Sequence, residues 1–224
     1  MTRLQRLSVN KIKLGILVSG RGSNLQAIID TIGSGTLSAE VAVVISDQSG
    51  AYSLERARKH AIPAVHISAQ DYKGKRDEYD ALLVQELRKH AVELVCLAGF
   101  MRIITPTLLE AFPNRVLNIH PALLPAFPGL HVQKAAIEHG VKFSGCTVHF
   151  VDAGMDTGPI IIQAVVPVLD NDTEDSLSER ILKQEHTIYS RAIQLFAEGK
   201  LNIAGRRVTV SGGKTTTDES LINP

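Results

Sequence analysis

The sequence predicts a single α/β domain with a Rossmann-like, mostly parallel sheet, antiparallel strands toward one edge, and helices on both faces. Short apolar runs alternate with segments of helical apolar spacing along most of the chain. The runs are apolar on both faces of a strand, as in a parallel sheet covered by helices on each side. With 224 residues the chain can bury a substantial core, and it fits one large domain better than two.

The first half of the chain supplies the repeating strand and helix units. Residues 12–18 form an apolar strand that ends in the turn residues 19–22, and a helix with a polar N-cap candidate starts at Ser23. The alternation then predicts a strand at 41–45, a helix at 53–60, a strand at 64–67, an amphipathic helix at 75–90 and a strand at 93–98.

The second half predicts a change of strand direction. The loop 152–158 between two apolar strands is so short that these strands are expected to be antiparallel. The expected elements are a short helix near 105–112, a strand at 115–119, a helix at 131–139, strands at 143–151 and 159–168, and a long helix at 173–198. We assign one core domain to residues 12–210, an N-terminal extension to 1–11, and a mobile polar tail to 211–224.

Charge and aromatic content argue against several classes of partner. Lys and Arg number 24 against 23 Asp and Glu, so the net charge of +1 gives no reason to expect nucleic acid or an acidic membrane. There is no Trp, and aromatic residues make up 4% of the chain. No apolar run approaches the length of a membrane span, and the N-terminus lacks the apolar core of a secretory signal. We expect a cytoplasmic protein that binds small-molecule substrates, with a homodimer left open.

The two cysteines indicate neither a metal site nor a redox pair. Cys96 and Cys146 each lie within an apolar run and lack CxxC spacing. They are expected to be buried free thiols in a reducing compartment.

The turn after the first strand is a candidate phosphate site. Backbone N–H groups and the helix dipole favour an anion where a strand leads into a helix through Gly20, Arg21 and Gly22. A dinucleotide fingerprint would need a third glycine where Leu25 stands, so a single phosphate monoester fits better. The alternative is an ordinary tight turn, and the pattern alone supports both about equally.

Asn118 and His120 are candidate catalytic residues. Side chains two residues apart on a strand point to the same face, and these two end a parallel strand, where open α/β sheets bind ligands. The Asn118 amide can donate to an oxyanion, and His120 can transfer a proton. The alternative is a structural histidine. His149 alternates within its strand and is expected to support the core or the site without binding a ligand.

The loop 152–158 carries two aspartates, which turn chemistry alone would explain as solvated. The loop joins strands that can fold back over the end of the preceding strand. A carboxylate beside His120 would stabilise imidazolium, the form that donates a proton. No nucleophile elbow and no metal-ligand spacing is present, so direct transfer through a tetrahedral intermediate remains.

Several motifs together resemble the phosphoribosylglycinamide formyltransferases (glycinamide ribonucleotide transformylases) of the folate-dependent formyltransferase superfamily. The matching segments run in order over nearly the whole chain: SGRGSNLQAII, LAGFMRI, LNIHPALLPAFPGLH, TVHFVD, GMDTGPII and KQEHTIY. The pattern Asn118-x-His120 with a distant Asp156 is shared by the superfamily, whereas the first and last motifs are narrower.

The resemblance implies a role for each matching position. Asn118, His120 and Asp156 would be catalytic, Gly22, Ser23 and Asn24 would hold the substrate 5′-phosphate, and Gln184 and Glu185 would meet its amine. The donor, 10-formyltetrahydrofolate, would be bound without a metal by Arg76, Met101, Arg102, Ile103, Ile104, Asp152, Ala153, Gly154 and Met155. The implied reaction transfers the formyl group to the amine of 5′-phosphoribosylglycinamide in purine biosynthesis.

Three alternatives share part of this pattern. Formyltetrahydrofolate deformylases have the same trio but carry an N-terminal regulatory domain, and only about eleven residues precede the first strand here. Methionyl-tRNA formyltransferases need a further RNA-binding domain, for which this chain has neither room nor charge. A non-catalytic nucleotide-binding module has no need of all three catalytic residues.

Overall fold

The computed structural model describes residues 11–212, so most of the N-terminal extension and of the tail assigned above lies outside the described residues. Its first half contains β1 (Ile12–Val18), α1 (Ser23–Gly33), β2 (Ala39–Ser46), α2 (Tyr52–Lys59), β3 (Ala64–His66), the 3-10 helix η1 (Gln70–Tyr72), α3 (Arg76–Lys89), β4 (Leu94–Leu97), α4 (Pro106–Ala111) and β5 (Val116–His120). The second half contains α5 (Val132–Glu138), β6 (Phe143–Phe150), β7 (Ile160–Pro167), α6 (Glu174–Ala197), β8 (Leu201–Ala204) and β9 (Arg207–Val210).

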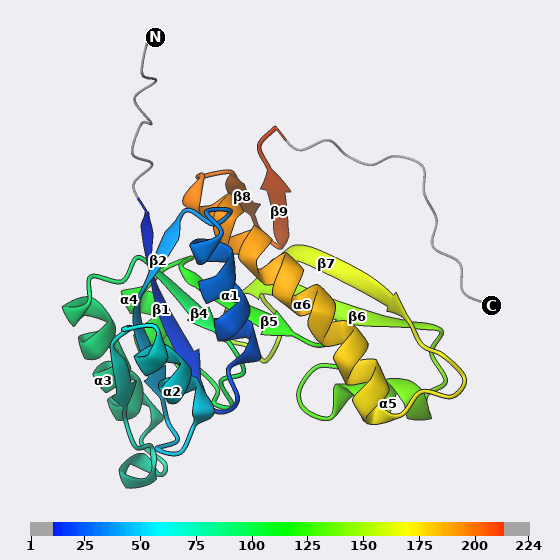
Figure 1. The fold of residues 1–224 in the computed structure, drawn as a ribbon, viewed down its shortest axis with the longest axis horizontal. Coiled ribbons are helices and arrows are strands. Elements are labelled where there is room, and N and C mark those ends of the chain that lie inside the picture. The colour runs from blue at the N-terminus through cyan, green and yellow to red at the C-terminus, as the bar shows by residue number, and fades with distance from the viewer. Residues whose placement is uncertain (1–10, 213–224) are drawn as a thin grey trace.

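The strands of the described chain form one sheet in the order β3-β2-β1-β4-β5-β6-β7-β9-β8 (Figure 1). The pairs among β1 to β5 are parallel, and β6 runs antiparallel to both β5 and β7. The predicted mixed sheet is therefore confirmed. The antiparallel pairing of β6 with β7 follows from the loop between them, which is too short for a parallel crossover.

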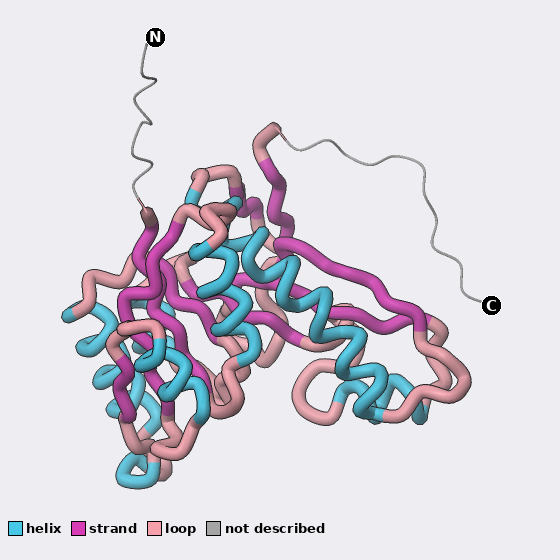
Figure 2. Tube along the Cα trace, in the orientation of Figure 1, coloured by secondary structure: helices cyan, strands magenta, loops and turns pink. Residues whose placement is uncertain are grey.

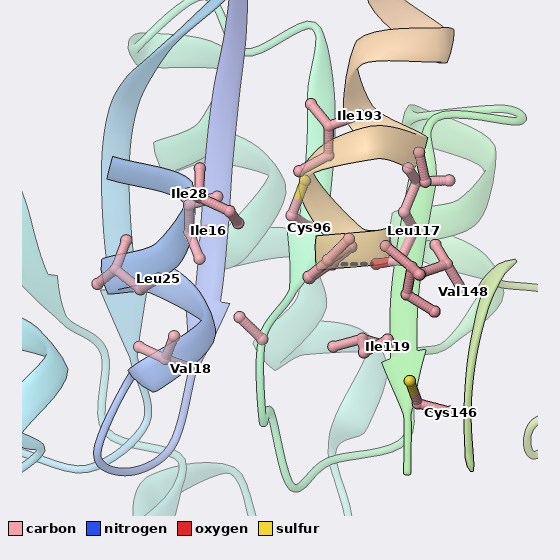
Figure 3. Packing of buried hydrophobic residues seen from close by; sticks show 14 of the residues in the cluster. Ile16, Val18, Leu25, Ile28, Cys96, Leu117, Ile119, Cys146, Val148 and Ile193 are labelled. Atoms are coloured by element: carbon pink, nitrogen blue, oxygen red, sulfur yellow. Dashed lines mark hydrogen bonds between the residues drawn. The ribbon is translucent and has the colours of Figure 1, made fainter. Parts of the chain in front are cut away.

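Two apolar layers hold the helices against the sheet. On one face, α1 and α6 cover the central strands, and Figure 2 shows both helices crossing in front of them. Figure 3 shows Ile28 of α1 and Ile193 of α6 among the side chains that pack with Leu117 and Ile119 of β5. A second cluster on the opposite face includes Leu83 of α3 and Leu108 of α4. Helices on both faces, as predicted, follow from strands that are apolar on both sides.

The hairpin of β8 and β9 was not expected from the sequence. Its two strands pair antiparallel, and β9 extends the sheet beside β7 through one parallel pair. The signal was present: LNIA and RVTV alternate apolar and polar residues on either side of Gly205 and Arg206. The strands are only four residues each, too short to give a strong pattern.

The other expectations on the described chain concern the thiols and the membrane. Cys96 and Cys146 are free and buried, as predicted, and burial raises the pKa of each thiol to about 12. Within residues 11–212, none of the helices combines the length and apolar character that crossing a membrane requires.

The helix α6 is fixed at its start by a capping box and in its middle by a tyrosine. The Ser176 backbone N–H donates to Thr173 Oγ1 (3.2 Å), and the Thr173 N–H donates to Ser176 Oγ (3.0 Å). Farther along, the buried Tyr189 hydroxyl lies 2.9 Å from the Leu97 carbonyl and 3.1 Å from that of Leu117. One hydroxyl therefore ties α6 to both β4 and β5.

We predict that Tyr189→Phe lowers the free energy of unfolding by about 1–2 kcal/mol, because it removes a buried donor while leaving the ring in place. Urea unfolding of the variant and the wild type measures the difference. Thr187→Val, which removes an exposed hydroxyl two residues away on α6, serves as the control. Equal stability of Tyr189→Phe and wild type would contradict a stabilising role for the hydroxyl.

Candidate active site

Two neighbouring cavities open at the carboxyl ends of the parallel strands. The larger, of about 600 Å³, is lined by segments 99–104, 118–121 and 129–133 and by most of 151–156. The smaller, of about 230 Å³, lies where β1 leads into α1 and is lined mainly by residues 19–24. This is the edge at which parallel α/β sheets bind ligands.

Asn118 and His120 reach the larger cavity from β5. Leu117 and Ile119, their neighbours along β5, are buried in the apolar layer under α6. Because successive side chains of a strand point to opposite faces, Asn118 and His120 point to the other side. Both line the larger cavity, as their spacing predicted. His120 is 4% exposed, so its ring is held almost wholly within protein.

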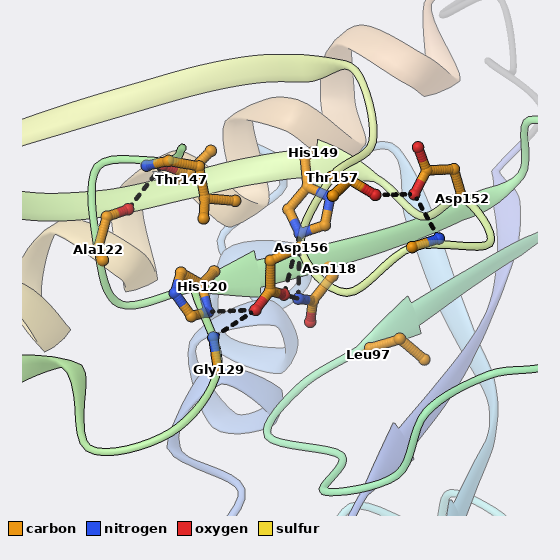
Figure 4. A network of polar contacts seen from close by, with 12 residues as sticks. Leu97, Asn118, His120, Ala122, Gly129, Thr147, His149, Asp152, Asp156 and Thr157 are labelled. Carbon is orange, nitrogen blue, oxygen red and sulfur yellow. Dashed lines mark hydrogen bonds and ion pairs between the residues drawn. The ribbon is translucent and has the colours of Figure 1, made fainter. Parts of the chain in front are cut away.

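Asp156 comes from the loop between β6 and β7 and contacts both residues of β5 (Figure 4). Its Oδ2 accepts from the Gly129 backbone N–H at 2.9 Å and lies 3.4 Å from His120 Nδ1. Its Oδ1 lies 3.5 Å from Asn118 Nδ2. The structure thus brings together the three residues that the sequence and the resemblance selected.

The His120 ring lies between two acceptors. Nδ1 faces the Asp156 carboxylate, and Nε2 lies 2.8 Å from the carbonyl oxygen of Phe127. A neutral imidazole has one N–H and would leave one acceptor facing a nitrogen lone pair, whereas imidazolium donates to both. In either protonation state, Nε2 must leave the Phe127 carbonyl before it can donate to a bound molecule.

The loop that carries Asp156 is closed by its own contacts. Asp152 Oδ1 accepts from the Gly154 N–H at 3.1 Å and from the Thr157 hydroxyl at 2.6 Å. Asp156 adopts the left-handed backbone region with φ of 54°. At Gly158 a Cβ atom would lie 1.8 Å from the Phe150 carbonyl oxygen, so only glycine lets the loop return this closely over β6.

The smaller cavity has the features of an anion site. Gly22 adopts φ of 69° at the start of α1, and a Cβ atom there would lie 2.6 Å from that of Ser53. No side chain caps this helix, so the backbone N–H groups of its first turn lack helical partners and favour an anion. The Ser19 hydroxyl accepts from the Met101 N–H at 3.0 Å and joins this loop to the larger cavity.

Asn24 and Glu185 line both cavities and form a polar wall between them. Asn24 Nδ2 donates to Glu185 Oε2 at 2.8 Å, although 161 residues separate the two in the sequence. Asn24 Oδ1 is buried and has no hydrogen-bond partner within the described chain. Glu185 is 7% exposed, and burial raises the pKa of its carboxyl group.

The remaining predicted binding residues divide into two groups. Those that line a cavity are Gly22 and Ser23 in the smaller one and Met101, Arg102, Ile103, Ile104, Asp152, Gly154 and Met155 in the larger one. Those that line neither are Arg76, Ala153 and Gln184. The roles that the resemblance implies for these three positions stay predictions.

Sequence reasoning did not single out Leu130, which lines the larger cavity, or the carbonyl of Phe127, which contacts His120. Leu130 lines that cavity with 72% of its surface exposed, and only a consecutive Gly-Leu-His in the sequence hinted at a turn there. The Phe127 carbonyl holds His120, but a backbone contact of this kind leaves no signal in residue type.

Comparison with known sequences gives one family. The family model described as formyl transferase matches residues 12–193. The phosphoribosylglycinamide formyltransferase of Escherichia coli is 44% identical over 188 residues, which cover 84% of this chain and 88% of that protein. The trifunctional purine biosynthetic protein adenosine-3 of Chironomus tentans is 48% identical over 204 residues, but this chain spans only 15% of its length.

Comparison with solved structures agrees. Glycinamide ribonucleotide transformylase 1 from Symbiobacterium toebii superposes with a TM-score of 0.88 at 54% identity, covering 94% of this chain and 98% of that one. A formyltetrahydrofolate deformylase from Pseudomonas syringae superposes with a TM-score of 0.84 at 26% identity, covering 91% of this chain and 67% of that one.

The burial of Glu185 leads to a pH-dependent prediction. Because the folded-state pKa of Glu185 is raised, its contribution to stability is present in full below the unfolded-state pKa. That contribution is lost as the pH rises through the folded-state pKa. Glu185→Gln keeps an acceptor for Asn24 but does not ionise, so it should unfold at higher urea than wild type near pH 8 and match it near pH 4. A variant that is no more stable at the higher pH would contradict this account.

Proposed function

The chain belongs to the formyl transferase family, and we propose on this basis that it transfers the formyl group of 10-formyltetrahydrofolate to the amine of 5′-phosphoribosylglycinamide in purine biosynthesis. One observation carries the proposal: Asn118, His120 and Asp156 meet beside a cavity that adjoins a second one at the start of α1, where backbone N–H groups suit a phosphate. A phosphate bound in the smaller cavity would select an acceptor amine that carries a phosphate over other amines.

The two cavities suit the two substrates. The smaller one offers the backbone of Gly22, Ser23 and Asn24 to a phosphate, and the Glu185 carboxylate beside it suits an amine, with Gln184 assisting. In the larger one, segment 101–104 and loop 152–155 would enclose the pterin, and Arg76 would contact the remainder of the folate. Exposed apolar side chains of Met101, Ile103 and Met155 favour a flat aromatic ligand there.

The mechanism follows from the groups around His120. The neutral amine attacks the formyl carbon, and a bond from nitrogen to carbon forms as the C=O electron pair moves to oxygen. The imidazolium of His120, after leaving the Phe127 carbonyl, and the Asn118 amide donate to this oxyanion. The amine nitrogen then loses a proton to water, and the oxyanion electron pair re-forms the C=O bond. The bond from the carbon to the folate nitrogen breaks as that nitrogen keeps the electron pair and takes up a proton from water. Asp156 keeps His120 charged and oriented throughout.

An assay with two arms tests the proposal. The protein is mixed with 10-formyltetrahydrofolate, with and without glycinamide ribonucleotide, and tetrahydrofolate release is followed. Release that requires the amine supports formyl transfer. Release without the amine would show hydrolysis, an activity that the likeness to the Pseudomonas syringae deformylase makes the second candidate. No release in either arm would leave a binding module and overturn the proposal.

We predict that alanine at each of the three positions slows transfer while the fold survives. Asn118→Ala should lower kcat on the order of 10²–10³-fold, as the loss of one oxyanion donor does. His120→Ala should lower it on the order of 10²–10⁴-fold, and Asp156→Ala should resemble it. Single-turnover transfer and thermal melting measure activity and fold together.

His66→Ala is the matched control, because His66 is exposed at the end of β3 and lines neither cavity. It should transfer formyl groups at the rate of wild type. Near-normal single-turnover transfer by His120→Ala would remove His120 from the mechanism.

A further inference from the structure

A second buried histidine lies against Asn118 from the neighbouring strand. His149 of β6 is the residue directly opposite Asn118 of β5 in the antiparallel register, and it is 2% exposed. Its Nε2 lies 3.2 Å from Asn118 Nδ2 and 3.8 Å from Asp156 Oδ1 (Figure 4). His149 therefore contacts two members of the proposed catalytic trio.

The protonation of His149 is set by its other nitrogen. Nδ1 lies 2.8 Å from the Phe150 carbonyl oxygen, which can only accept, so Nδ1 carries a hydrogen. Burial lowers the pKa of His149, and a positive charge on His120 acts in the same direction. Together they outweigh the Asp156 and Asp152 carboxylates, which raise that pKa. The ring is therefore neutral, and Nε2 presents a lone pair.

That lone pair decides which way the Asn118 amide points. An N–H of Asn118 donates to Nε2 of His149, whereas the flipped amide would place its oxygen against a lone pair and against the Asp156 carboxylate. The second N–H makes only a 3.5 Å contact with Asp156 Oδ1, at the limit of a hydrogen bond. A developing oxyanion can therefore accept a hydrogen bond from this weakly held N–H.

We propose that His149 is a positioning residue: through Nε2 it holds the Asn118 amide so that one N–H stays free for the oxyanion. The inference rests on the proposed formyl transfer. His149 itself touches no substrate in this scheme and acts only through Asn118. It differs from His120 in its other partners, although the two histidines flank the same carboxylate: His149 faces the Phe150 carbonyl and the Asn118 amide.

Two substitutions separate positioning from a structural role. In His149→Asn the side-chain amide falls near the Nδ1 position and can still donate to the Phe150 carbonyl, but it cannot reach Asn118. In His149→Gln the amide oxygen falls near the Nε2 position and can accept from Asn118, but the contact with Phe150 is lost. A residue needed only to hold β6 would tolerate Asn better than Gln.

If His149 positions Asn118, His149→Gln should transfer formyl groups faster than His149→Asn. We expect His149→Asn to lower kcat by about 10- to 100-fold, because a displaced donor misses the oxyanion, with the KM values of both substrates within about twofold of wild type. His149→Gln should keep kcat within about threefold of wild type. In an Asn118→Ala background, either change should have little further effect. A His149→Asn enzyme with the kcat of wild type, or one no worse than His149→Gln, would overturn the proposal.

Nuclear magnetic resonance of the ring nitrogens tests His149 without any activity. In ¹⁵N-labelled wild-type protein at neutral pH, His149 should show the Nδ1–H neutral tautomer, because Nδ1 faces a carbonyl and burial lowers the pKa of the ring. The Nε2–H tautomer or a charged ring would overturn the proposal even if the variants lose activity. Absence of transfer in wild type would instead refute the proposed function and leave this measurement to decide the role of His149.

Discussion

The pairing of β5 with β6 is the constraint on which the rest of the site depends. It sets Asn118 opposite His149 and His120 opposite Thr147, whose hydroxyl donates to the Ala122 carbonyl (2.7 Å) and accepts from the Leu124 N–H (3.1 Å). The same register buries Leu117 under α6. A slip of one residue would exchange the polar and apolar faces of β5, so the energy of burying the core also fixes the polar residues of the cavity.

One carboxylate then contacts two histidines whose rings face different partners. Asp156 meets His120 with Oδ2 and His149 with Oδ1, and the difference lies in what each ring faces beyond it. His120 has an acceptor at each nitrogen, whereas His149 has a carbonyl at one and the Asn118 amide donor at the other. Residue type alone cannot distinguish these roles, because they arise from backbone carbonyls and from strand register.

The sequence predicted the alternation of strands and helices because burial on a sheet or helix leaves a periodic pattern. It also placed Asn118 and His120 together, since spacing along a strand determines which face a side chain takes. Asp156 could be assigned to the site only through the family resemblance, because a residue with left-handed φ in a tight loop leaves no periodic pattern in the sequence. The hydrogen bond of Asn24 with Glu185 was equally hidden, because it joins α1 to α6 across most of the chain.

That hydrogen bond has a consequence for synthesis of the protein. As the chain emerges from the ribosome, β1 to β5 can form long before α6 is complete, but the Asn24 amide lacks Glu185 and the Leu97 carbonyl lacks the Tyr189 hydroxyl until residues 185 and 189 are free. The wall between the two cavities is therefore completed only after residue 185 has emerged. A nascent or truncated chain that ends before α6 would carry Asn118 and His120 yet lack Glu185 from this wall, so both cavities would be open on that side.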